Sequence, residues 1–202
     1  LSVRTMLFPE SVAVVGAGRR ADSIGHQLLA NIIAAGFKGR VHAVNTEAQE
    51  VLGLKAYAKV SDIPDPVDLA VVAVPAESVL DVVADCAAAG VKTLLVGSAG
   101  FAESGPVGEQ RQKELKRTAR ENGMRVIGPN SFGLINSHPD VCLNASLAPV
   151  LPPAGHLGLF SQSGALGIAV LADAAKRNLG ISIFASAGNR VDVSGNDLMQ
   201  FW

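Results

Sequence analysis

Two short segments rich in glycine and serine carry the residue types best suited to holding a phosphate group. Residues 16–25 begin Gly-Ala-Gly-Arg-Arg and end at Gly25. Small residues let a ligand approach the backbone, and guanidinium groups match phosphate oxygens in charge and geometry. Residues 161–164 read Ser-Gln-Ser-Gly, which offers hydroxyls and free amides without a lysine. The first segment predicts a site for a nucleotide or another phosphate-bearing ligand, and the second predicts an anion site.

A strand and a helix must position the first segment. Residues 12–15 form a continuous apolar run that ends at Gly16, which is typical of a strand covered on both faces in a parallel sheet. Behind the segment, apolar residues recur at helical spacing: Ile24, Leu28, Leu29, Ile32 and Ile33. Asp22 or Ser23 is expected to accept from the first amides of this helix. Because parallel sheets bind ligands at the carboxyl ends of their strands, we expect the ligand there.

The rest of the chain alternates strands with helices. Further strands are expected at residues 40–44, 69–74, 93–96, 124–127, 157–160 and 181–185. Helices are expected at residues 78–89, 109–122 and 165–176, with another that begins at Asp197. Residues 51–57 are expected to be irregular and residues 61–66 to form a proline-containing loop. The alternation predicts an α/β fold with a parallel, doubly wound sheet.

A cluster of three prolines marks the expected domain boundary, at Pro149, Pro152 and Pro153. We predict one domain over residues 1–146, a proline-rich linker over 147–155 and part of a second domain over 156–202. The segment after the linker is too short to bury the surface that an independent domain needs. Its last helix groups Leu198, Phe201 and Trp202 on one side, which requires a covering surface. We therefore expect the natural protein to continue past Trp202.

The composition argues against several classes of protein. The 202 residues are 49% apolar and 17% charged, and the formal net charge is −1. This balance gives no electrostatic case for a nucleic acid or for an anionic membrane surface. Aromatic residues make up only 4%, which argues against a base-stacking platform. No apolar run approaches the roughly 18 residues of a membrane span.

The cysteines and histidines do not form a recognisable metal or catalytic set. Cys86 and Cys142 lack metal-ligand spacing and are expected to be reduced thiols, in a helix and a strand, of a cytoplasmic protein. The four histidines are scattered, with His26 in a helix, His42 in a strand, and His138 and His156 in loops. We therefore predict no metal site and assign no catalytic residue within this chain.

Simpler interpretations of both phosphate-site segments stay open. Residues 16–21 fit the dinucleotide pattern Gly-x-Gly-x-x-Gly/Ala, but Asn45 is neutral where such proteins usually place an acidic residue. That weakens an NAD interpretation. Both arginines could be solvated loop residues, and ordinary N-capping by Ser161 or Ser163 would by itself explain the serines.

The expected strand ends carry a series of motifs in a fixed order. They are residues 11–17 with Gly25, 44–45, 74–76, 98–101, 128–130 with Gly133, 161–167, 188–189, and Asp192 with 197–198. Together they resemble the CoA-binding subunit or domain of the NDP-forming acyl-CoA synthetases, which include the α subunit of succinyl-CoA ligase. The resemblance implies a Rossmann-like CoA-binding domain followed by the start of a flavodoxin-like ligase domain. Residues 194–198 are similar to an actinobacterial version that is joined to an ATP-grasp domain and sometimes to an N-acetyltransferase domain.

The resemblance also implies roles by position. The phosphates of CoA or acyl-CoA would be held by the loop that contains Gly16, Gly18, Arg19, Arg20 and Gly25. Asn45 would lie near the adenosine, and Asn130 would approach the thiol end. The nucleotide and pantetheine would be lined by Val74, Pro75, Ala76, Ser98, Ala99 and Gly100. A phosphoryl group carried by a histidine would be held by Ser161, Ser163 and Gly164.

The implied reaction joins a carboxylic acid to CoA through an acyl phosphate, with phosphate passed to or from ADP by that histidine. In the family the phosphorylated histidine lies beyond residue 202, so the chain by itself is expected to be inactive. ADP, ATP and Mg²⁺ would bind only through other parts of the protein, and an ATP-grasp partner and an oligomer are implied. After Asn45, relatives commonly carry proline and a basic residue, whereas this chain has Thr46 and Glu47. That difference puts the phosphate contact on the adenosine side in doubt.

Two other functions compete with the ligase interpretation. One is an NAD-dependent dehydrogenase domain, which would use the same strand-end loops for a different dinucleotide. The other is a CoA-sensing regulatory module attached to an acetyltransferase, which would bind CoA without any ligase chemistry. Calorimetric titration with CoA and with NAD distinguishes the ligase from the dehydrogenase. The sequence that follows Trp202 distinguishes the ligase from the CoA-sensing module.

Overall fold

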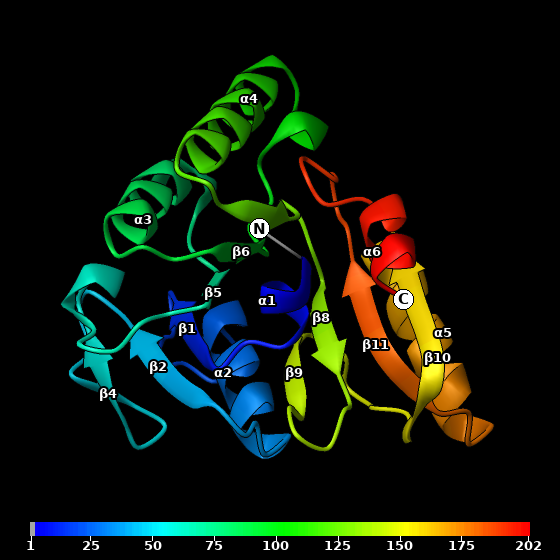
Figure 1. Ribbon diagram of the computed structural model, residues 1–202. Coiled ribbons are helices and arrows are strands. Elements are labelled where there is room, and N and C mark those ends of the chain that lie inside the picture. Colours follow the sequence, from blue (N-terminus) through cyan, green and yellow to red (C-terminus); the bar gives the residue numbers. More distant parts are fainter. Residues whose placement is uncertain (1–2) are drawn as a thin grey trace.

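The computed structural model describes residues 3–202, which form two β-sheets with helices packed around them (Figure 1). The larger sheet has the strand order β3-β4-β2-β1-β5-β6-β7. Its strands are β1 (Ser11–Val15), β2 (Arg40–Val44), β3 (Glu50–Val51), β4 (Leu54–Tyr57), β5 (Leu69–Val72), β6 (Thr93–Val96) and β7 (Arg125–Ile127). The smaller sheet has the order β10-β11-β8-β9. Its strands are β8 (Gly133–Asn136), β9 (Leu143–Ser146), β10 (Ala154–Ser161) and β11 (Ile181–Ser186).

Six α-helices and two 3-10 turns connect these strands. The α-helices are α1 (Val3–Leu7), α2 (Ile24–Ala34), α3 (Ala76–Ala88), α4 (Pro106–Glu121), α5 (Gly164–Lys176) and α6 (Gly195–Phe201). The 3-10 turns are η1 (Val60–Asp62) and η2 (Ala102–Ser104). None of the helices between residues 3 and 202 has the length and apolar character that a bilayer crossing requires.

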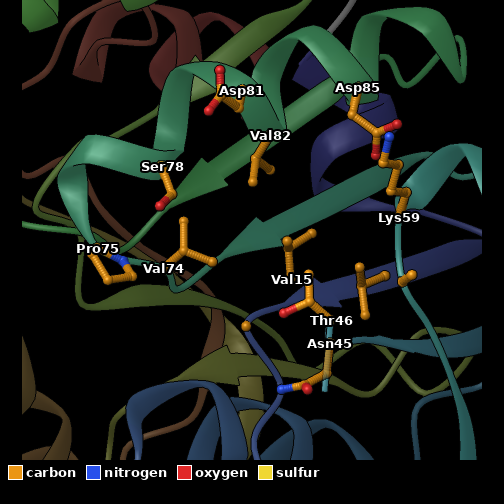
Figure 2. A pocket seen from close by; sticks show the side chains of 13 residues that line it. Val15, Asn45, Thr46, Lys59, Val74, Pro75, Ser78, Asp81, Val82 and Asp85 are labelled. Atoms are coloured by element: carbon orange, nitrogen blue, oxygen red, sulfur yellow. The ribbon is translucent and has the colours of Figure 1, made fainter. Parts of the chain in front are cut away.

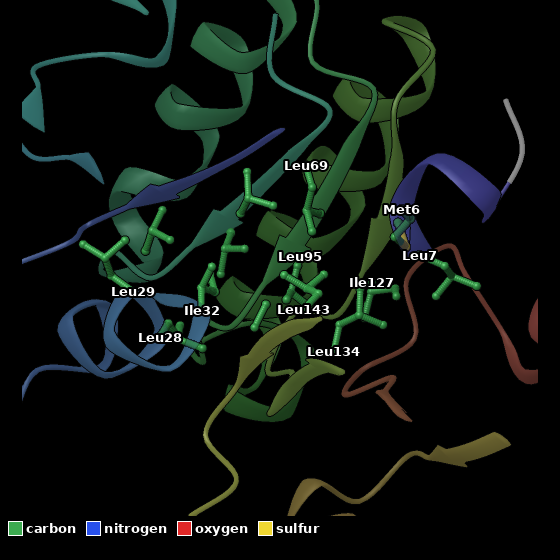
Figure 3. Close-up of a cluster of buried hydrophobic side chains, with 14 of the residues drawn as sticks. Met6, Leu7, Leu28, Leu29, Ile32, Leu69, Leu95, Ile127, Leu134 and Leu143 are labelled. Carbon is green, nitrogen blue, oxygen red and sulfur yellow. The ribbon is translucent and has the colours of Figure 1, made fainter. Parts of the chain in front are cut away.

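The larger sheet confirms the prediction of a parallel, doubly wound fold. β1 pairs in parallel with β2 on one side and with β5 on the other, and β5, β6 and β7 continue in parallel. On one face, Val12 and Val14 of β1 pack in a cluster with α2, and Figure 3 shows Leu28, Leu29 and Ile32 of that helix against the sheet. On the other face, Ala13 and Val15 pack in a cluster with residues of α3 and α4. Burial of both faces explains why these strands are uniformly apolar.

Several local expectations are wrong, mainly at the sheet edge. Residues 51–57 are not irregular, because β4 pairs in parallel with β2 and β3 pairs antiparallel with β4. Part of the loop expected at residues 61–66 belongs to the 3-10 turn η1. Cys142 lies in the turn before β9 with φ +51°, and not in a strand. His156 lies in β10, and not in a loop. These strands are short or mostly solvent-exposed, so they lack the apolar runs that identified β1 and β5.

The smaller sheet combines strands from both sides of the proline cluster. β8 and β9 precede the predicted linker, β10 and β11 follow it, and β8 pairs antiparallel with β11. Leu134 and Leu143 of this sheet lie in the same cluster as α2 and the larger sheet (Figure 3). The predicted boundary at residues 147–155 stays a prediction, and strand pairing connects the segments on its two sides.

An ion-pair network connects the start of α6 and the segment before it to the larger sheet. Arg125 of β7 contacts Asp192 at 2.7 Å and Asp197 at 2.9 Å. Burial opposes ionisation of Asp197, but hydrogen bonds from Ser194 and Arg125 outweigh it and lower its pKa to about 2. The carboxylate of Asp197 therefore stabilises the fold only while it is ionised.

Acid should weaken this network over a defined range of pH. Since the pKa of Asp197 is lower in the folded chain than the ordinary value of 3.8, its stabilisation is full above about pH 4 and is lost as the pH falls toward 2. The side chain is 29% exposed, and after solvent screening we expect a loss of about 1–2 kcal/mol. Urea unfolding between pH 5 and pH 2 measures this loss. Asp197→Asn should flatten the decline, and an unchanged slope would contradict the assignment.

Candidate functional site at the carboxyl ends of the larger sheet

Two adjoining cavities lie along the carboxyl ends of the larger sheet. The first, about 430 Å³, opens over the ends of β1 and β2 and beneath α3 (Figure 2). The second, about 460 Å³, lies over the loops that follow β5, β6 and β7. Val74 and Pro75 line both cavities, so the two adjoin at these residues, and together they are called the cleft here. From β1 the sheet extends to β2 on one side and to β5 on the other. The first cavity lies at this point, which is the usual ligand position in doubly wound sheets.

Glycines bring the start of α2 directly against the end of β1. Gly16 has φ +90°, and a Cβ at this position would lie 2.4 Å from the carbonyl oxygen of Ala73. A Cβ on Gly25 would lie 2.1 Å from the carbonyl oxygen of Gly16. Neither position accepts a side chain without movement of the backbone. Only glycine therefore fits at these two positions of the loop that we predicted to hold phosphates.

The first turn of α2 has no side-chain cap, which corrects the expectation that Asp22 or Ser23 would provide one. The hydroxyl of Ser23 donates to the carbonyl oxygen of Arg20 at 2.8 Å, and Asp22 pairs with the guanidinium of Arg20 at 3.0 Å. Arg19 is exposed and forms no ion pair within residues 3–202. The loop thus combines uncapped amides, a helix dipole and a guanidinium, a combination that suits an anion.

Asn45 has a structural role that accounts for its neutral side chain. Its Nδ2 donates to the carbonyl oxygen of Ala17 at 2.9 Å. Its Oδ1 accepts from the amides of Glu47 and Ala48, both at 2.8 Å. An aspartate would lack the donor that Asn45 directs to Ala17. Asn45 lines the first cavity and joins the loop after β1 to the loop after β2.

The second cavity is built from strand-end loops that bond to one another. The hydroxyl of Ser98 donates to the carbonyl oxygen of Val74 at 2.6 Å. The amide of Asn130, which has φ +59°, donates to the carbonyl oxygen of Ser98 at 2.9 Å. The cavity is apolar apart from a few such groups, which is usual for a small-molecule site.

The structure brings most of the predicted CoA residues together. Those that line the cleft are Gly16, Asn45, Val74, Pro75, Ala76, Ser98, Ala99 and Asn130. Those that lie outside the lining, on the loops beside it, are Gly18, Arg19, Arg20, Gly25 and Gly100. The structure places these residues at the expected edge of the sheet, and their contact with a ligand stays a prediction.

The sequence analysis missed one wall of the first cavity. The cavity is lined by Ser78, Asp81, Val82 and Asp85 of α3, and Figure 2 shows Ser78 and Val82 pointing from the helix toward the strands. The spacing of the four residues, by three, one and three, describes one helical face, so the sequence contained this signal. Thr46 and Lys59 complete the lining, but Lys59 could not be placed without the edge strand β4.

The predicted phosphoryl loop at residues 161–164 uses its hydroxyls internally. Ser163 caps α5 by accepting from the amide of Leu166 at 3.3 Å, as the simpler interpretation expected. Ser161 donates to the carbonyl oxygen of Ser163 at 2.7 Å. A Cβ on Gly164 would lie 1.9 Å from the ring of Phe132, which also lines the second cavity. This loop is therefore separated from the cleft by one aromatic side chain.

No group of three or more histidine, cysteine, aspartate or glutamate side chains in the described part of the chain could hold a metal ion. Both cysteines are unpaired thiols, and burial raises the pKa of Cys86 to about 12. The polar side chains that line the two cavities are hydroxyls, amides, two carboxylates and one lysine, among them Asp81, Asp85, Lys59 and Ser98.

Comparison with known proteins shows which families the chain matches. Residues 10–137 match the family described as CoA binding domain, and residues 154–202 match the succinyl-CoA ligase like flavodoxin domain. The alpha subunit of acetate–CoA ligase (ADP-forming) I from Pyrococcus furiosus is 38% identical over 206 residues, covering 100% of this chain and 44% of the subunit. Acetate–CoA ligase (ADP-forming) II from Archaeoglobus fulgidus is 34% identical, covering 98% of this chain and 30% of that protein.

Solved structures show the same likeness. The dinucleotide-forming acetyl-coenzyme A synthetase 1 of Ca. Korarchaeum cryptofilum, in complex with phosphate and ADP, superposes with a TM-score of 0.93 and 44% identity. The superposition covers 99% of this chain and 42% of that one. A Pyrococcus horikoshii protein superposes with a TM-score of 0.94 and 38% identity, covering 98% of this chain and 45% of that one. The chain spans less than half the length of each of these relatives.

Proposed function

The chain belongs to the CoA-binding domain family, and from this premise we propose that it is the CoA-binding part of an NDP-forming acid–CoA ligase. The observation that carries the proposal is the pair of adjoining cavities along the carboxyl ends of the larger sheet, with Gly16 in the lining of the first. Two adjoining cavities suit an extended ligand with a nucleotide at one end, and the mainly apolar second cavity suits a pantetheine arm.

We assign the parts of CoA to the cleft by their chemistry. The pyrophosphate would lie at the uncapped start of α2, which Gly16 and Gly25 allow to approach the end of β1 closely and where Arg19 supplies charge. The adenosine would occupy the first cavity beside Asn45, and the pantetheine would pass Val74 toward Asn130. Each assignment follows the charge and polarity of the residues that line the cavities.

We further propose that the loop at Ser161, Ser163 and Gly164 receives a phosphoryl group. The loop precedes α5, a helix of 13 residues whose amino end carries a positive partial charge. The contact of Gly164 with Phe132 places the loop next to the end of the cleft assigned to the thiol. In the implied reaction the phosphohistidine gives its phosphoryl group to the acid, and the CoA thiol then displaces phosphate from the acyl phosphate. The phosphoryl group and the thiol would therefore have to lie close to each other.

The whole protein would join a carboxylic acid to CoA while a nucleoside triphosphate is cleaved to the diphosphate and phosphate. The relatives named as ADP-forming ligases support this activity for the parent protein. ADP or ATP with Mg²⁺ would bind to an ATP-grasp partner. The chain supplies the CoA site and no reacting side chain. A cytoplasmic location, an oligomer and an acetyltransferase fusion stay predictions.

Calorimetric titration with CoA and with NAD tests the proposal. We expect CoA to bind with one site per chain and NAD to give no heat at the same concentrations, because Asn45 directs an amide and not a carboxylate at this edge. Heat with NAD and none with CoA would support the dehydrogenase, which the comparisons do not favour. A CoA sensor would also bind CoA, and the absence of ligase activity in the parent protein would identify it.

A further inference from the structure

One polar bridge connects the cleft to a residue outside the matched CoA-binding region. Asn189 follows β11 and lies beyond residues 10–137. Its Nδ2 donates to a carboxylate oxygen of Glu103 and, at 2.8 Å, to the Oε1 of Gln112. Glu103 belongs to η2 and Gln112 to α4, which follow the loop after β6 that lines the second cavity. The bridge therefore joins the two segments that matched different families.

On the cleft side, Glu103 holds the loop that lines the second cavity. Its Oε1 accepts from the amide of Gly100 at 2.6 Å and from the amide of Phe101 at 3.1 Å. Burial opposes ionisation, but hydrogen bonds from Asn189 and these two amides outweigh it and lower the pKa of Glu103. One ionised carboxylate therefore fixes both the loop and the amide of Asn189.

On the other side, the backbone next to Asn189 packs on the turn that carries Asn130. The amide of Asn189 donates to the carbonyl oxygen of Pro129 at 2.8 Å. A Cβ on Gly188 would lie 2.2 Å from that oxygen and 2.5 Å from the carbonyl oxygen of Asn130. Residues 188–189 thus contact both loops that form the second cavity, one through the backbone and one through a side chain.

We propose that Asn189 is a positioning residue for CoA binding. It holds the loop at residues 98–100 and the turn at residues 128–130 at the separation that CoA binding requires. This inference rests on the proposed function. It implies that residues 10–137 do not complete the CoA cleft by themselves, and that the segment after β11 contributes to affinity. Asn189 acts through Glu103 and the backbone, and not by contact with the ligand.

The test exchanges donor and acceptor across the bridge. Asn189→Asp sets a second carboxylate against that of Glu103 and removes the donor, so CoA affinity should fall about tenfold, the equivalent of one lost charged hydrogen bond. Adding Glu103→Gln should restore most of it, because the introduced amide keeps an oxygen for Gly100 and gains an N–H for the new carboxylate. Asn196→Asp, an exposed site in α6, is the matched control and should bind CoA as the parent does.

Hydrogen–deuterium exchange at residues 98–101 provides a second readout that does not need CoA. Exchange should accelerate in Asn189→Asp and return toward the parent rate in the double variant. Unchanged affinity in Asn189→Asp, or loss without rescue, would overturn the proposal. If the parent chain bound no CoA, the proposed function would fall, and the exchange rates would still decide whether the bridge holds the loop. Should Asn189→Asp fail to fold, Asn189→Ala with the same two measurements replaces it.

Discussion

Gly25→Ala is expected to abolish most CoA binding and to destabilise the fold. The added Cβ would lie 2.1 Å from the carbonyl oxygen and 2.6 Å from the carbonyl carbon of Gly16. Both atoms belong to backbone at the centre of the cleft, so the clash cannot be relieved by a side-chain rotation. Either α2 moves outward or the loop after β1 shifts. Overpacking of this kind costs about 3 kcal/mol, and displaced phosphate-binding amides should weaken CoA binding by at least about tenfold.

Urea unfolding and calorimetric titration with CoA measure these two effects. Gly18→Ala is the matched control in the same loop, because its Cβ would lie 3.2 Å from the side chain of Ser23, which can rotate. We expect this control to retain stability within about 1 kcal/mol. Equal effects of the two substitutions would show that the close approach of α2 to Gly16 is not what positions the loop.

Asp192→Ala is expected to loosen the attachment of the segment before α6 to the larger sheet. The Asp192 side chain is 6% exposed and accepts from Arg125 at 2.7 Å and from the amide of Val126 at 3.1 Å. Its removal leaves the backbone amide of Val126 without this acceptor and leaves Asp197 as the remaining carboxylate partner of Arg125. One lost charged hydrogen bond together with an unsatisfied amide costs about 2–3 kcal/mol.

Asp173→Ala is a control with the same change and the same geometry at the surface. Asp173 also contacts an arginine, Arg177, at 2.7 Å, but its side chain is 59% exposed. Solvent screening reduces such a pair to about 0.3–0.5 kcal/mol. Denaturant midpoints of the two variants should therefore differ clearly. Similar midpoints would mean that burial of Asp192 adds no stability.

The position of the candidate site, at the carboxyl ends of the strands, was largely predictable from the sequence. Most of the predicted CoA loops follow a strand that is uniformly apolar or nearly so, such as β1 before Gly16 and β6 before Ser98. Parallel strands with both faces buried all place their carboxyl ends at one edge, so the order of motifs predicts where the loops meet. The face of α3 that carries Asp81 and Asp85 could be recognised from its spacing, and the sequence analysis did not identify it.

The sequence by itself determined the strand–loop–helix order, the glycine positions and the family resemblance, because local apolar runs and small residues encode these features. Only the tertiary structure decided which loops bond to one another. The bridge from Glu103 to Asn189 spans 86 residues, and β8 pairs with β11 across the proline cluster. Such contacts depend on how two sheets pack, and no local pattern specifies a partner so distant in the chain. The same is true of Lys59, whose place in the first cavity depends on an edge strand too short to show alternation.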